Sequence, residues 1–101
     1  MKQFLIRYRR TEGSPENWHR EIAAFIAAID SDPALKGKIG YRCLKACDGV
    51  DYFHIATVHD DAGRVALQDR DFFKHYTQAT RQIAGGVVDV TPIETVAETV
   101  A

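Results

Sequence analysis

The sequence predicts an α+β protein in which two helical segments cover one face of a small antiparallel sheet. Segments with apolar residues at helical spacing alternate with segments whose apolar residues recur at every second position, as in strands. Several strand-like segments are apolar on both faces, so the sheet needs a cover on each side. In a chain of 101 residues the helices supply one cover. We expect the same face of a second copy to supply the other, which makes the protein a homodimer.

Composition limits the classes of partner. Lys and Arg number 13 against 14 for Asp and Glu, for a net charge of -1, so no nucleic-acid partner is expected. The first ten residues do not resemble a secretory signal, and no 18 apolar residues run together. We therefore expect one domain over residues 1–101, in the cytoplasm and without a membrane partner.

Four segments have the period-two alternation of strands. They span residues 3–9, 39–46, 52–59 and 87–96. In the first, Phe4, Ile6 and Tyr8 share one face. Pro92 lacks the amide hydrogen that a strand ladder uses, so the last strand is expected at an edge of the sheet or with a bulge at that point.

The first helical segment lies between the first two strands. Ser14 and Pro15 predict its start, because a Ser side chain accepts from free amides of the first turn and Pro at the first helical position loses no needed donor. Residues 30–33 end it. Its apolar stripe consists of Trp18, Ile22, Phe25, Ile26 and Ile29.

The second helical segment is expected in two pieces. Asp60 or Asp61 caps its start, Arg70 and Asp71 mark a bend, and the glycines at 85–86 end it. The stripe of its second piece consists of Phe72, Tyr76, Ala79 and Ile83. The order strand, helix, strand, strand, helix, strand predicts a ferredoxin-like βαββαβ sandwich with an antiparallel sheet.

With this order, the stretch YFHIATVHDDAGRVALQDRDFFKHYTQA and the closing VVDVTPIETV resemble the dimeric α/β-barrel superfamily, and within it the antibiotic-biosynthesis monooxygenase-like proteins. The resemblance implies a dimer whose two sheets face each other, with a ligand held in each subunit between sheet and helices. It also implies an oxygenase that needs no metal, flavin or other cofactor. An electron-rich phenolate itself reduces oxygen, so the site must only bind it, deprotonate it and exclude water.

Haem-degrading relatives in the same group use an Asn on the first strand, a Trp near the end of the third and a His in the second helix. This chain has no Asn in its first strand, and its sole Trp18 lies in the first helix. The helical His position falls on Leu67. Haem degradation by that route is therefore not expected.

His54 and Tyr76 are the candidate catalytic residues. His54 lies in the middle of the third strand among apolar neighbours, where a buried imidazole with a lowered pKa accepts a phenol proton near neutral pH. The alternative is a histidine of the core or dimer interface with one hydrogen bond. Tyr76 brings a hydroxyl into an apolar space, where it needs a partner, and a structural role is equally compatible with its position.

Six further side chains are candidates for the substrate pocket: Tyr8, Trp18, Tyr41, His59, Phe72 and His75. Aromatic side chains at strand or helix spacing also form ordinary core, and histidines are often exposed, so each has a structural alternative. Arg7, Arg9 and Arg42 lie on strands and either bind an acidic ligand group or form ion pairs. Asp89 and Glu94 are available partners.

The sequence has no phosphate-binding loop, nucleophile elbow or paired-His metal motif. Nothing in it therefore indicates a kinase or a hydrolase. Cys43 and Cys47 complete no zinc set and are expected as reduced thiols, with a redox pair as the alternative. The sequence favours a cofactor-independent monooxygenase that oxidises a small aromatic or quinol substrate. The alternative is a non-enzymatic dimer that binds a small apolar ligand or has a stress-related role. If Tyr8, His54 and Tyr76 converge on a cavity, the enzyme is favoured, and if the space between them is packed solid, the non-enzymatic dimer is favoured.

Overall fold

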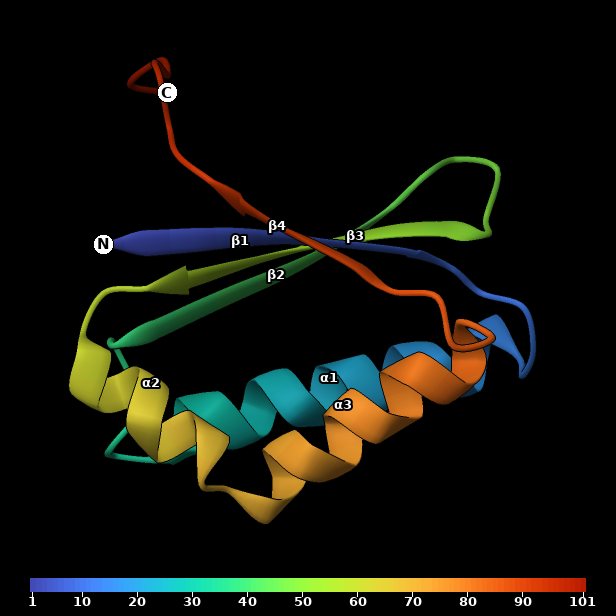
Figure 1. Ribbon diagram of the computed structural model, residues 1–101, viewed down its shortest axis with the longest axis horizontal. Helices are drawn as coiled ribbons and strands as arrows, with labels where there is room; N and C mark the ends of the chain where they lie inside the picture. Colours follow the sequence, from blue (N-terminus) through green and yellow to red (C-terminus); the bar gives the residue numbers. More distant parts are fainter.

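The chain forms two layers, a four-stranded sheet and a layer of helices that all lie on one side of it (Figure 1). The computed structural model describes residues 1–101. Its elements are β1 Lys2–Arg9, α1 Pro15–Ser31, β2 Ile39–Lys45, β3 Asp51–Val58, α2 Asp61–Gln68, α3 Asp71–Ile83 and β4 Asp89–Ile93. The predicted βαββαβ order is confirmed, and the second helical segment is divided in two as expected.

The sheet is antiparallel throughout, with the strand order β2-β3-β1-β4. Ile6 on the central strand β1 lies opposite His54 on β3 and Val90 on β4. Pro92 lies opposite Phe4 on the edge strand β4, where a missing amide hydrogen is tolerated. The edge position predicted from this proline is therefore confirmed.

The last strand is shorter than predicted. Val87 and Val88 precede it, because the amide of Val87 is used in the turn that follows α3. Residues 94–96 lie beyond its end. Ile93 pairs with Gln3, and because β1 begins at Lys2, it has almost no residues left to pair with positions after 93. Alternation alone does not show where the partner strand runs out.

The start of α1 follows from local chemistry. The Ser14 hydroxyl accepts from the amide of Asn17 at 3.1 Å, and Pro15 occupies the first turn. The predicted stripe faces the sheet: Trp18, Ile22, Phe25 and Ile29 are buried and Ile26 is half-buried. Full burial of each such side chain stabilises the fold by roughly 1.5–3 kcal/mol.

The bend between α2 and α3 is held to the end of α1. Asp60 caps α2, accepting from the amide of Ala62 at 2.7 Å, and Asp61 lies in the first turn. At the bend, the Arg70 guanidinium donates to the carboxylate of Asp32 at 2.7 Å. This partly buried ion pair joins the start of α3 to the end of α1.

Gly63 is buried within α2, against the loop before β2. A Cβ added to Gly63 would lie 2.7 Å from the Cβ of Lys38. Alanine inside a helix normally gains about 1 kcal/mol over glycine, but here the collision requires backbone movement. Gly63→Ala should therefore lower the free energy of unfolding by about 1–3 kcal/mol in urea denaturation. A gain in stability would contradict this account of the packing.

No helix covers the other face of the sheet, here called the open face (Figure 1). Its apolar side chains are Leu5, Leu44, Phe53, Ile55 and Ile93, of which Leu44 is exposed and the others are half-buried. Two strand arginines form ion pairs within the chain, Arg7 with Asp89 at 3.0 Å and Arg9 with Asp51 at 3.1 Å. Arg42 is exposed. In the other layer, none of the helices is long and apolar enough to cross a membrane.

Candidate functional site

A hydrogen-bonded group of five side chains is centred on His54, which has no exposed surface. Its Nε2 lies 2.8 Å from the hydroxyl of Tyr8, and the indole Nε1 of Trp18 donates to the same hydroxyl at 2.8 Å. On the other side of the ring, Nδ1 contacts the hydroxyls of Tyr41 and Tyr76, the latter at 3.2 Å. These two hydroxyls lie 3.1 Å apart. We call these five residues the His54 network.

The sheet register assembles three of the five residues. His54 lies opposite Ile6 on β1 and Cys43 on β2. Tyr8 and Tyr41 are each two positions from those partners, so all three side chains point to the helix-facing side of the sheet. The other two residues, Trp18 and Tyr76, come from the buried stripes of α1 and α3, in the helical layer that packs on this face.

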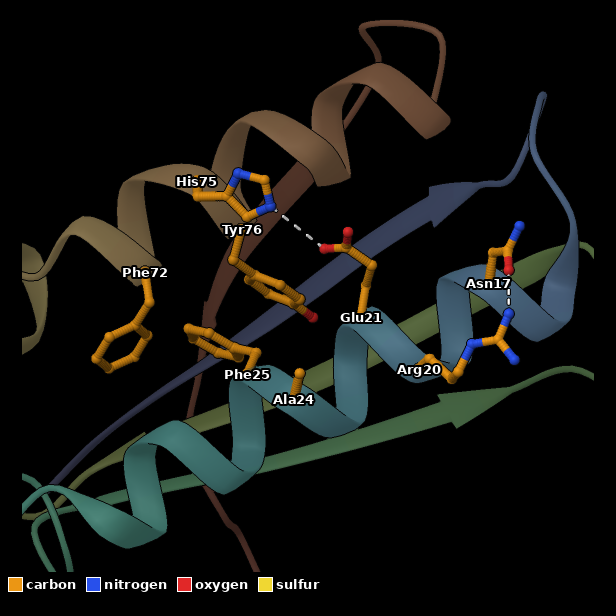
Figure 2. Close-up of a pocket in the computed structure, with 8 residues that line it drawn as sticks. All are labelled: Asn17, Arg20, Glu21, Ala24, Phe25, Phe72, His75 and Tyr76. Carbon is orange, nitrogen blue, oxygen red and sulfur yellow. Dashed lines mark hydrogen bonds and ion pairs between the residues drawn. The ribbon is translucent and has the colours of Figure 1, made fainter.

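Stacking fixes the ring of Tyr76. Phe25 lies parallel to it, with ring centroids 3.8 Å apart, and Trp18 lies nearly parallel at 5.7 Å. Figure 2 shows the rings of Phe25 and Tyr76 lying between α1 and α3. Aromatic contacts of this kind add about 0.5–1.5 kcal/mol beyond burial. The hydroxyl of Tyr76 is therefore held in one place relative to His54.

The His54 network is uncharged at neutral pH. Burial lowers the pKa of His54 from 6.5 to about 4. Burial also raises the pKa of Tyr8, Tyr41 and Tyr76, because a buried phenolate loses its hydration. Each phenol keeps its hydrogen and the imidazole has one nitrogen without a hydrogen. Neighbouring Cys43 is also neutral, since burial raises its pKa to about 11.

A cavity of about 640 Å³ lies beside this network, between the sheet and the helices, and we call it the inner cavity. Its wall has 18 residues, 12 of them hydrophobic, and includes Tyr41 and Tyr76. Arg64 and Arg81 are its charged residues, and no carboxylate lines it. Pockets that bind small molecules range over roughly 300–1,000 Å³ and are mostly apolar with a few polar groups. The inner cavity has these properties.

A second hollow, the outer groove, runs between α1 and α3 on the far side of the aromatic rings (Figure 2). His75 lies beside Glu21 across it, with Nε2 3.5 Å from the carboxylate. Phe25 and Tyr76 line both the outer groove and the inner cavity. Their stacked rings therefore form the wall between the two.

Five of the eight candidate residues meet in the His54 network: Tyr8, Trp18, Tyr41, His54 and Tyr76. Phe72 and His75 border the outer groove instead. His59 is exposed and borders neither space, because β3 ends at Val58 and the amide of His59 bonds to the loop before β2. No group of three or more His, Cys, Asp or Glu side chains is placed to hold a metal ion.

The sequence patterns did not reveal the two arginines that line the inner cavity, Arg64 and Arg81. Phe73, Thr77 and Arg81 all line the cavity. They are spaced four residues apart, so they form a second stripe on the helix beside that of Tyr76, and this spacing could have predicted that Arg81 faces the cavity. His19 is exposed, and its ring bonds to the hydroxyl of Tyr52 at 2.8 Å. That contact joins α1 to β3 away from the inner cavity.

No protein-family model matches the chain, and no curated protein is similar to it. Solved structures are similar over nearly the whole chain. SnoaB, a cofactor-independent oxygenase from Streptomyces nogalater, is 22% identical with a TM-score of 0.68, covering 98% of this chain and 96% of its own. An antibiotic biosynthesis monooxygenase is 9% identical with a TM-score of 0.74, covering 96% and 100%. A protein of unknown function from Nitrosomonas europaea is 14% identical with a TM-score of 0.67, covering 99% and 94%.

These identities are low, so the likeness concerns the fold. Nearly complete coverage of both chains means that the same elements follow in the same order with no added domain in the matched structures. The resemblance predicted this arrangement from the order of the segments. The prediction is confirmed: the chain has the ferredoxin-like fold of the antibiotic-biosynthesis monooxygenase-like proteins.

Proposed function

We propose that this protein is a cofactor-independent monooxygenase that oxidises a small aromatic or quinol substrate with molecular oxygen. The observation that carries the proposal is the mostly apolar inner cavity of about 640 Å³, with the hydroxyls of Tyr41 and Tyr76 belonging to its wall residues. Similarity to structures described as an oxygenase and a monooxygenase supports it.

The chemistry makes modest demands on the protein. A 1,4-dihydroxyarene and O₂ give a hydroxyquinone and water: one oxygen atom forms a new bond to a ring carbon and the other leaves as water. The substrate supplies all four electrons, so no external reductant enters the balance. The protein must hold the substrate in an apolar space and stabilise its electron-rich form.

His54 acts through its neighbours in this proposal. It has no exposed surface and does not line the inner cavity, whereas Tyr41 and Tyr76 both line it and contact Nδ1 of His54. His54 is thus a positioning residue that orients the two hydroxyls. The phenols are the groups that touch the substrate.

Oxygen consumption with 1,4-dihydroxynaphthalene tests the proposal. We expect uptake above the rate of the quinol alone, with a hydroxynaphthoquinone as product, and loss of most of that uptake in His54→Gln. The matched control is Tyr52→Phe, which removes a buried hydroxyl bonded to His19 outside the network. Uptake no greater than without protein, across a panel of naphthols and quinols, would contradict the proposal. Binding without uptake would then favour a ligand-binding protein.

We also propose that the protein is a homodimer joined through the open face. Half-buried Leu5, Phe53 and Ile55 lie there uncovered by any helix. The paired arginines and carboxylates on the same face give it both signs of charge, which suits contact with an identical surface.

Sedimentation at micromolar concentration tests the dimer. The wild-type chain should sediment as a dimer and Ile55→Glu as a monomer, because a carboxylate would be buried without a partner. Val65→Glu is the control, since Val65 is 55% exposed on α2, away from the open face, and should leave the dimer unchanged. A wild-type monomer would contradict the proposal.

A further inference from the structure

We propose that the hydroxyls of Tyr41 and Tyr76 form a binding site for one anionic oxygen, so that a phenol occupies the inner cavity as its phenolate. The inference rests on the proposed function only for the place of the ligand. It adds the charge state of the ligand and the groups that select it.

Whichever nitrogen of His54 carries the hydrogen, the contacts within the network can take only four of its five hydrogens. Its donors are the indole N–H of Trp18, three phenol O–H groups and one N–H of the neutral imidazole. Trp18 is a donor only, so its hydrogen takes a lone pair of Tyr8. The contacts that remain are those of His54 with three hydroxyls and that between Tyr41 and Tyr76.

In the tautomer with hydrogen on Nδ1, Tyr8 donates to Nε2 and the imidazole donates to one of the two other hydroxyls. That hydroxyl donates to its neighbour, and the last hydrogen of the Tyr41 and Tyr76 pair has no acceptor in the protein. In the other tautomer, Nε2 donates to Tyr8 and the Tyr8 hydrogen is left over in the core, where its side chain is buried against Tyr52.

Only the first tautomer places the surplus hydrogen on residues that line the inner cavity. A buried donor without an acceptor costs stability, so a ligand oxygen beside the pair relieves that cost and selects the Nδ1 tautomer. The best complement is an oxygen with lone pairs and no hydrogen of its own. A phenolate meets this requirement and makes the stronger, charge-assisted bond.

The surroundings favour an anion. From α2 and α3, Arg64 and Arg81 line the inner cavity, and no carboxylate lines it. Arg64 already pairs with Asp61 at 2.9 Å, whereas Arg81 forms no ion pair. The titratable groups that face the pair from the strands are neutral: Tyr8 on β1, Cys43 on β2 and His54 on β3. The cavity thus has a positive balance of charge.

The network itself is a poor acceptor of the ligand's proton. Protonation of His54 would add a second surplus hydrogen, and burial holds its pKa at about 4. The proton therefore goes to solvent when a phenol binds, and affinity rises with pH until the free phenol is itself ionised. The resulting phenolate is the form that gives electrons to oxygen most readily.

Absorbance titration of 4-nitrophenol measures the charge state directly, because its phenolate has a distinct visible band. The apparent pKa of the bound probe should fall by about one unit or more, which corresponds to at least about tenfold tighter binding of the phenolate than of the phenol. The double variant Tyr41→Phe/Tyr76→Phe should abolish the shift. Tyr52→Phe, the matched control, should keep it.

A second probe needs no variant. 4-Nitroanisole keeps the nitrophenyl ring but has a methoxy group in place of the hydroxyl and cannot ionise, so at about pH 8 the wild-type protein should bind it at least about tenfold more weakly than 4-nitrophenol. Equal affinity for the two probes, an unshifted pKa, a shift that survives in the double variant, or no binding of 4-nitrophenol would overturn the inference. Neither probe is turned over, so a phenolate shift without oxygen uptake on quinols keeps the inference and removes the proposed oxygenase.

Discussion

Replacement of Phe25 by alanine should lower the free energy of unfolding by about 3–5 kcal/mol. The Phe25 side chain is 4% exposed and stacks on Tyr76 at 3.8 Å. It also meets Tyr41 edge-on at 5.1 Å and packs at an angle on Phe72 and Phe73. Truncation removes all of these contacts and joins the inner cavity to the outer groove, so neighbouring rings cannot close the space. Urea denaturation monitored by circular dichroism measures the loss.

Two variants calibrate that result. Phe25→Leu keeps most of the volume and should cost less than Phe25→Ala. Val65→Ala removes an exposed side chain and should change stability by less than about 0.5 kcal/mol. A loss below about 1 kcal/mol for Phe25→Ala would mean that the rings of Tyr41 and Tyr76 collapse into the vacated space, and would contradict a wall held by stacking.

Acid should destabilise the protein through His54. Its pKa is about 4 in the fold against an ordinary 6.5, so between these values the unfolded chain binds more protons than the folded one. Stability therefore rises with pH across this window and is lost as pH falls through it. From about pH 7 to about pH 4 the loss due to this group is about 3 kcal/mol.

Denaturant titrations at a series of pH values test this assignment when wild type is compared with His54→Gln. Asp32, Asp48 and Asp61 also have lowered pKa values because of their hydrogen-bond partners, and they contribute to acid sensitivity in both proteins. The difference between the two curves isolates His54. The variant should be less stable at neutral pH and should lose less stability on acidification. Parallel curves would show that the imidazole is not held neutral by burial.

Local signals in the sequence predicted the elements of the fold well. Ser14 and Asp60 are caps because a short polar side chain beside a helical stripe satisfies free amides in any tertiary context. The period-two pattern correctly predicted that His54 is buried on one face of the sheet, but it left open whether that face meets the helices or a second copy; in the structure Tyr8 and His54 are buried on the side that the helices cover. The end of β4 at Ile93 was beyond such signals, because it depends on where β1 stops.

The site was only partly predictable for the same reason. Periodicity assigns Tyr41 and His54 each to one face of its own strand, but it does not say which face the helices cover, and the sheet register decides that their polar atoms meet. That register depends on pairing between distant segments, which no local pattern specifies. His59 was predicted to line the substrate pocket, and this prediction is wrong. Strand β3 ends at Val58, one residue earlier than predicted, and His59 is exposed.

In the proposed reaction, one oxygen atom from O₂ enters a substrate held in the inner cavity. Reaction of 1,4-dihydroxynaphthalene under oxygen-18 gas, with mass spectrometry of the product, tests it most directly. We expect a hydroxynaphthoquinone that carries one oxygen-18 atom, formed in proportion to wild-type protein and reduced in Tyr41→Phe/Tyr76→Phe. An unlabelled naphthoquinone accompanied by labelled hydrogen peroxide would show simple dehydrogenation of the quinol and would contradict the claim.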